Sequence, residues 1–156
     1  MKKYILLSCT ILWMGMIFLF SSQEADKSSR VSNSFLDKTV VKVYKVFDSS
    51  LTEKDENNIQ EIWFVPIRKI AHFFVYFVLG ILVLLTLKEY NVKKNICYYA
   101  ILICFLYSVS DEIHQLFVDG RSGEFLDVLL DTFGSMISIV CLWYFYLKNK
   151  VNFLSN

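Results

Sequence analysis

Residues 70–87 read IAHFFVYFVLGILVLLTL, and this stretch decides the fold class. Only His72 interrupts its run of apolar and weakly polar side chains. As a helix rising 1.5 Å per residue, the stretch would be about 27 Å long, close to the ~30 Å thickness of the hydrocarbon core of a bilayer. The stretch therefore predicts a membrane-spanning helix.

Three further stretches extend this prediction along the chain. Residues 4–20 contain no charged side chain, and residues 96–118 and 125–147 are apolar except for a few polar positions near their outer ends. The first stretch follows two lysines, as a signal peptide does, but no small-residue cleavage site follows it, so we expect an uncleaved anchor. The sequence thus predicts an all-α integral membrane protein, a four-transmembrane-helix bundle with spans at about 4–20, 70–87, 96–118 and 125–147.

The composition narrows the class of protein. Of the 156 residues, 55% are hydrophobic and 20% are charged, whereas soluble domains are about 45–50% apolar and about 25% charged. The net charge of +1 gives no reason to expect nucleic-acid binding. The four cysteines lie in apolar stretches without a CxxC spacing, so neither a disulfide nor a cysteine-based metal site is expected. No cofactor is predicted.

The long segment between the first two spans is expected to contain an amphipathic outer helix. Its apolar residues approximate one helix face: Val31, Phe35, Val40, Val43, Tyr44 and Phe47. Residues 48–58 are polar and resemble a turn. Pro66 is expected in the first turn of the second span, where its missing N–H costs nothing.

Lysines predict the orientation and the domain boundaries. They gather at both ends of the chain and between the second and third spans, at positions 2, 3, 93, 94, 148 and 150. Positive residues near span ends favour the cytoplasm. We therefore expect both termini inside, one membrane domain over residues 1–147, and a short cytoplasmic tail over residues 148–156.

Polar side chains gather where the spans should meet the outer membrane face. On the second span, Arg68, His72 and Tyr76 recur every four residues and share a helix face, while Lys69 suits an anchor at the membrane interface. At the end of the third span, the helical repeat places Asp111, His114 and Gln115 on one face and Glu112 about a quarter turn away.

The fourth span begins with an acidic stripe that contains Asp127 and Asp131. An aspartate at the bilayer centre costs about 2.5–3.5 kcal/mol on insertion scales, so these acids should have basic partners. Arg121, Arg68, His72 and His114 are the candidates, with Arg121 nearest in sequence. A structural ion-paired cluster and a functional site are both consistent with this pattern.

Two kinds of chemistry suit such a site. Basic and polar side chains would hold a phosphate or carboxylate by charge-assisted hydrogen bonds, and the candidates are Arg68, Lys69, His72, Tyr76, Gln115 and Arg121. Alternatively, acids and imidazole would act as catalytic groups, and the candidates are Asp111, Glu112, His114, Asp127 and Asp131. No metal site is assigned, because the Glu112-x-His114 spacing does not place both residues on one helix face.

The same residues resemble the VanZ-like family of membrane proteins. The resemblance rests on FSSQ at 20–23, RKxAHFxxYxxLG at 68–80, SDExHQxFVxGRxG at 110–123, and the Asp127-Val128, Asp131 and Gly134 positions that follow. One departure is Asp119, which replaces a proline that the family usually has there.

The resemblance implies a bacterial plasma-membrane protein of the cell envelope. The family's namesake is associated with low-level resistance to the glycopeptide teicoplanin. A non-enzymatic protein that interacts with a membrane lipid or a lipid-linked cell-wall precursor would fit this association. The alternative is a membrane-embedded enzyme that acts on a lipid-linked phosphate or ester through the Asp/Glu/His cluster.

Overall fold

Helices joined by short turns form the described structure, a computed structural model that describes residues 1–22, 40–47, 52–118 and 123–154. Their order along the chain is α1 (Lys2–Ser21), α3 (Lys42–Phe47), α4 (Glu53–Glu89), α5 (Ile96–Gln115) and α6 (Phe125–Leu154). Four segments are long and apolar enough to cross a membrane: Lys2–Ser21, Pro66–Glu89, Ile96–Gln115 and Phe125–Lys148. The predicted all-α architecture with four spans is therefore confirmed.

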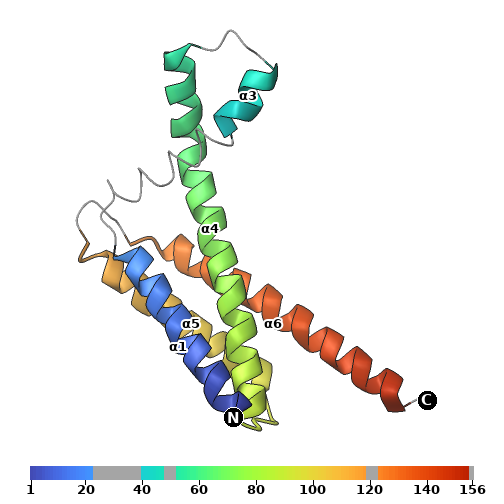
Figure 1. The fold of residues 1–156 in the computed structure, drawn as a ribbon. Coiled ribbons are helices and arrows are strands. Elements are labelled where there is room, and N and C mark those ends of the chain that lie inside the picture. Colours follow the sequence, from blue (N-terminus) through green and yellow to red (C-terminus); the bar gives the residue numbers. More distant parts are fainter. Residues whose placement is uncertain (23–39, 48–51, 119–122, 155–156) are drawn as a thin grey trace.

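Helix α4 differs from its prediction at the N-terminal end. A capping box begins the helix: the Thr52 side chain accepts a hydrogen bond from the Asp55 N–H at 3.4 Å, and the Asp55 carboxylate accepts one from the Thr52 N–H at 3.0 Å. The turn predicted over residues 48–58 is therefore wrong from residue 53 onward. Pro66 lies inside the helix and not in its first turn, although the apolar span does begin there. The N-terminal part of α4 consequently extends beyond the ends of α1 and α5 (Figure 1).

The outer helix predicted before α4 is described only at its C-terminal end. There it forms α3, with Val41 buried just before it and Val43 and Val46 exposed. The predicted apolar positions Val31 and Phe35 lie outside the described residues.

The two ends of the α5–α6 segment also differ from prediction. Helix α5 ends at Gln115 and is followed by a turn, so the third span is shorter than the predicted 96–118. Helix α6 continues past residue 147 to Leu154, so the predicted tail begins as helix. The C-terminal part of α6 runs away from the other helices, and both chain ends lie at the same end of the molecule (Figure 1).

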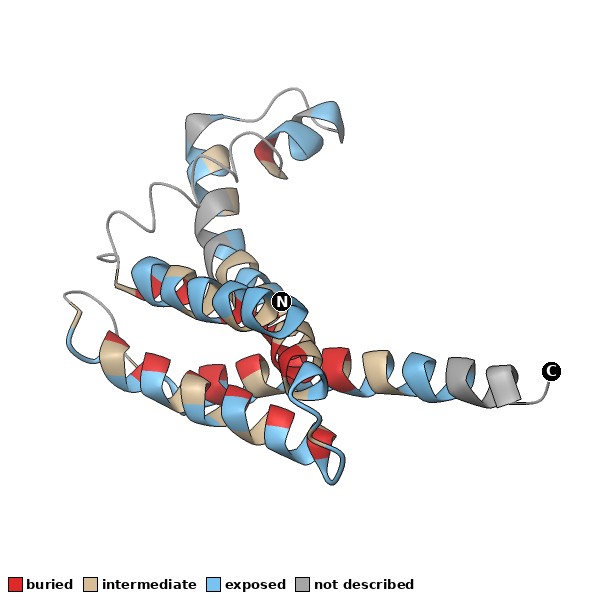
Figure 2. Cartoon of the chain, turned by 60° about the horizontal axis from the view of Figure 1, so that its bottom comes forward, coloured by how far each residue is buried: buried red, intermediate tan, exposed pale blue. Residues whose placement is uncertain are grey.

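Helix α4 is the centre of the packing and contacts α1, α5 and α6. Its Tyr76, Leu79, Val83 and Leu84 are buried together with apolar residues from the other spans. Buried residues line the inner faces of the helices and exposed residues the outer faces (Figure 2). Many of the exposed residues have large apolar side chains. Exposed apolar outer faces are what a lipid environment requires, which supports the assignment of the four spans.

Helix α1 is attached to its neighbours by side chains that reach backbone carbonyls. The Trp13 indole donates to the Val75 carbonyl of α4 at 3.0 Å, and the Tyr107 hydroxyl of α5 donates to the Met14 carbonyl of α1 at 2.6 Å. In an apolar environment, such bonds satisfy polar groups that water cannot reach. They place the C-terminal end of α1 beside the polar cluster described next.

Candidate functional site

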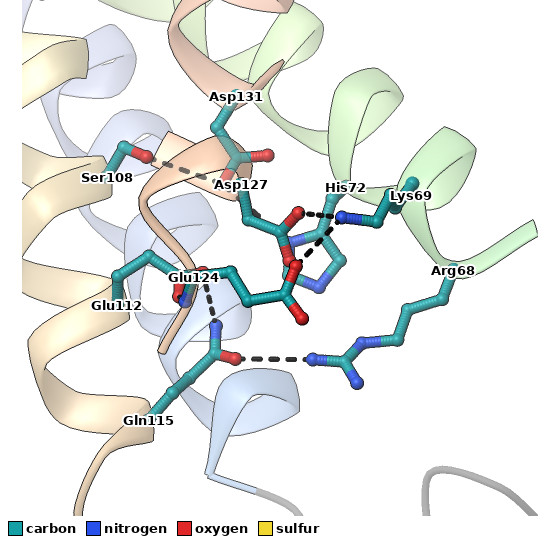
Figure 3. A network of polar contacts seen from close by, with 9 residues as sticks. All are labelled: Arg68, Lys69, His72, Ser108, Glu112, Gln115, Glu124, Asp127 and Asp131. Atoms are coloured by element: carbon teal, nitrogen blue, oxygen red, sulfur yellow. Dashed lines mark hydrogen bonds and ion pairs between the residues drawn. The ribbon is translucent and has the colours of Figure 1, made fainter. Parts of the chain in front are cut away.

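Charged and polar side chains from three helices meet at one end of the bundle (Figure 3). They come from the early part of the α4 span, from the C-terminal end of α5 and from the N-terminal end of α6. We call this set the outer cluster; its drawn members are Arg68, Lys69, His72, Ser108, Glu112, Gln115, Glu124, Asp127 and Asp131. The predicted meeting of polar residues from spans two, three and four is thus what the structure shows.

Lys69 is the cation partner of Asp127. Its ammonium lies 2.5 Å from the Asp127 carboxylate and 3.2 Å from that of Glu124. The Asp127 side chain is only 12% exposed, whereas that of Glu124 is 51% exposed, so Asp127 depends more on this partner. The sequence predicts Lys69 as an anchor at the membrane interface, and the ion pair with Asp127 is an additional contact. Arg121, the predicted partner nearest to the acids of span four in sequence, lies outside the described residues.

His72 and Ser108 converge on the fully buried Asp131. The His72 Nδ1 atom lies 3.7 Å from Asp131 Oδ2, and the Ser108 hydroxyl donates to the same oxygen at 3.4 Å. His72 was a predicted partner for the acids of span four. Ser108 was not predicted; its only sequence signal is its position three residues before Asp111, on the same helix face.

Gln115 is the junction between α4 and α5. Its amide nitrogen donates to Glu112 at 3.0 Å and to Asp111 at 3.4 Å, and its amide oxygen accepts from the Arg68 guanidinium at 3.3 Å. The second carboxylate oxygen of Glu112 accepts from the Glu124 N–H at 2.9 Å, just before α6 begins. Gln115 therefore connects a surface arginine to two buried acids.

His114 does not belong to this cluster. Its ring stacks on Phe18 of α1 at 4.1 Å between centroids, and its Nε2 lies 2.9 Å from the Ser22 hydroxyl. Asp111 and Gln115 contact each other on one face of α5, as predicted, but His114, predicted on the same face, contacts α1, and Glu112 contacts Gln115 as well. Ser22 of the FSSQ stretch thus acts as a contact between α1 and α5.

Tyr76 lies deeper than the other predicted binding residues. It is fully buried and belongs to the apolar core as well as to the polar end of the bundle. Its burial removes it from any ligand at the surface. The part of the chain that the structure describes contains no group of three His, Cys, Asp or Glu side chains arranged to hold a metal ion.

These observations define a multi-pass membrane protein with a buried ionic cluster at one end of its helical bundle. A sequence model of the family described as VanZ/LLP1 matches residues 6–147, nearly the whole chain. The chain belongs to the VanZ/LLP1 family, which confirms the resemblance seen in its motifs. No curated protein and no solved structure matches it.

Proposed function

We propose that this chain is a bacterial plasma-membrane protein of the cell envelope that binds the anionic headgroup of a membrane lipid or of a lipid-linked cell-wall precursor. The observation that carries the proposal is the set of contacts that the Arg68 guanidinium makes. Within the described residues, its guanidinium contacts one neutral amide, that of Gln115, and no carboxylate. The adjacent Lys69, in contrast, is neutralised by two carboxylates.

The position of Arg68 suits a headgroup ligand. It is the third residue of the apolar span Pro66–Glu89 and is partly exposed, so its guanidinium lies near the membrane interface. A guanidinium has five N–H donors and binds phosphate through two parallel hydrogen bonds. One N–H group of Arg68 donates to the Gln115 amide oxygen, which orients the arginine side chain (Figure 3). The other N–H groups of Arg68 remain as donors for an anion.

The family's association with teicoplanin would follow from such binding. A lipid-tailed glycopeptide concentrates at the membrane surface, where a protein that holds a precursor headgroup would change the access of the drug. We therefore propose low-level teicoplanin resistance as the consequence for the cell.

Extraction of the protein with its native lipids tests the role of Arg68. Arg68→Ala should reduce the anionic lipid retained per chain several-fold, because a charge-assisted contact contributes about 1.5–3 kcal/mol. Arg68→Lys should retain an intermediate amount, since an ammonium lacks the planar fork. The measurement is quantitative lipid mass spectrometry of the purified protein.

Lys93→Ala is the matched control, because it removes an exposed positive charge from the loop at the other end of the bundle. It should leave the retained lipid unchanged. The same lipid complement in Arg68→Ala and in the unaltered chain would exclude Arg68 as the headgroup contact.

A membrane-embedded enzyme is the second candidate. The pair of His72 and Asp131 favours it, because an imidazole beside a carboxylate is a common acid–base arrangement. Asp111, Glu112 and Asp127 lie in the same cluster, whereas His114 is directed toward α1 and is removed from the candidates. Turnover of a lipid phosphate or ester by the purified protein, abolished in His72→Ala, would favour this candidate over simple binding.

For the topology, we infer that both termini are cytoplasmic and that the outer cluster faces outward, within one domain over residues 1–147. In a variant without its four native cysteines, an impermeant maleimide should label Asn57→Cys in intact cells. Lys93→Cys should be labelled only after permeabilisation, because the lysine-rich loop favours the inside. Labelling of position 93 but not of position 57 in intact cells would reverse the orientation.

A further inference from the structure

Within the part of the chain that the structure describes, three buried oxygen atoms in or beside the outer cluster make no hydrogen bond of ordinary geometry. They are the hydroxyl oxygen of Tyr76 and one carboxylate oxygen, Oδ1, of both Asp111 and Asp131. All three side chains are at most 2% exposed, so water at the surface does not reach them. Buried polar atoms are nearly always paired, and three unpaired ones in one region call for a physical explanation.

The three residues lie within electrostatic range of one another and come from three different helices. Tyr76 of α4 interacts electrostatically with both Asp111 of α5 and Asp131 of α6, and the two aspartates interact with each other. Ser108 supplies a fourth oxygen, because its hydroxyl lies 3.4 Å from Asp131. The four side chains therefore lie near one another between α4, α5 and α6.

This region has more negative charge than the described residues compensate. Among the described residues, Asp111 has only the neutral Gln115 amide as a hydrogen-bond partner, and Asp131 has the Ser108 hydroxyl at 3.4 Å and His72 at 3.7 Å. Lys69 is engaged by Asp127 and Glu124, and Arg68 by Gln115. Carboxylates inside a membrane bundle mark ion or proton pathways. Among the described residues, only His72 lies against one of these two carboxylates, that of Asp131, and it is a cation only when protonated.

We propose that Tyr76, Ser108, Asp111 and Asp131 form a buried site for one small monovalent cation, of which Na⁺ is the representative. Carboxylate and hydroxyl oxygens are hard ligands that suit hard cations. The site is separate from the proposed headgroup contact at Arg68 and stands without it.

Thermal unfolding of the purified full-length protein tests this site. The midpoint should rise saturably with NaCl when N-methyl-D-glucamine chloride keeps the ionic strength constant, because a cation that binds only the folded state stabilises it. Asp111→Asn and Asp131→Asn should abolish this rise. Without Na⁺, Asp111→Asn should be at least as stable as the unaltered protein, since it removes a buried charge that no cation of the described residues contacts.

A control variant, a ligand variant and a direct binding measurement accompany the unfolding experiment. Glu89→Gln, which changes an exposed acid at the other end of α4, should keep the full Na⁺ response. Tyr76→Phe should weaken Na⁺ binding on the order of tenfold, the equivalent of about 1.4 kcal/mol for one lost ligand. If an Asn variant does not fold, equilibrium binding of radioactive sodium to the unaltered protein and to Tyr76→Phe decides the question.

Saturable binding of one sodium ion per chain, weakened in Tyr76→Phe, supports the site. A midpoint that does not respond to Na⁺, or the absence of saturable sodium binding, overturns it and leaves buried water as the partner of these oxygens. Because the readout involves no lipid, failure here is distinguishable from failure of the headgroup proposal.

Discussion

Replacing Lys69 with Met is expected to destabilise the protein more than any other single change in the outer cluster. The substitution keeps an apolar stem of similar length but removes the charge that neutralises Asp127 and Glu124. Removing one partner of a buried ion pair costs about 3–5 kcal/mol, and because the Lys69 side chain is 34% exposed we expect about 2–3 kcal/mol. The measurement is the fraction of folded protein in detergent during unfolding titration.

Removing the acid as well should restore much of this loss. In Lys69→Met combined with Asp127→Asn, no uncompensated charge remains at the 12% exposed position, while Glu124 is exposed enough to be solvated. The double variant should therefore be more stable than Lys69→Met alone. Lys54→Met, an exposed lysine in the N-terminal part of α4, is the control and should change little. Strictly additive effects of the two substitutions would show that the pair is not coupled.

The spans could be predicted from sequence because their length and apolar content are local properties. Residues 70–87 lie within the α4 span, and the four predicted spans correspond to α1, α4, α5 and α6. The early start of α4 was also encoded locally: Thr52 is followed three residues later by Asp55, and this pair forms the capping box. It was missed because the polar residues around it were interpreted as a turn, and because Pro66 offered a simpler helix start.

The partners within the outer cluster could not be predicted in the same way. Which side of α5 faces inward depends on where α1 and α6 pack, and adjacent positions such as 111 and 112 differ by about 100° around the helix. The sequence therefore predicts His114 beside Asp111 and Gln115, with Glu112 about a quarter turn away, whereas in the structure His114 contacts Ser22 of α1 and Glu112 contacts Gln115. Lys69 is the partner of Asp127 in the structure, but its sequence position beside the apolar span is equally typical of an interface anchor, and the sequence does not distinguish the two roles.

Gly80→Ala and Gly134→Ala are expected to have the second large effect, through the packing of α4 on α6. A Cβ atom at Gly80 would lie 2.7 Å from the Ser135 carbonyl oxygen and 2.9 Å from its Cα, and it would also clash with the Ser138 hydroxyl. A Cβ atom at Gly134 would lie 2.6 Å from the Phe73 carbonyl oxygen. Apart from the Ser138 hydroxyl, these neighbours are backbone atoms, which cannot rotate away as the end of a side chain can.

Helices α4 and α6 would therefore have to separate and would lose van der Waals contact. In a bilayer, no hydrophobic driving force between the helices offsets this loss of contact. Association of spans depends on close contact between small residues, and here the glycines face Ser135, Ser138 and the Phe73 backbone. Overpacking of a tight core costs about 1–3 kcal/mol and occasionally more, and we expect the upper part of that range or loss of the folded protein.

Gly15→Ala provides the matched control within the same chain. It is a glycine on a membrane-spanning helix, but a Cβ atom there would meet nothing within 4 Å. The substitution should be neutral or slightly stabilising, because alanine favours the helix by about 1 kcal/mol over glycine. Folded yield and the unfolding midpoint in detergent compare the three variants directly. If Gly80→Ala and Gly134→Ala behave like Gly15→Ala, then α4 and α6 do not pack as closely as the structure places them, and the carboxylates of α6 would lose the contacts with α4 that position them.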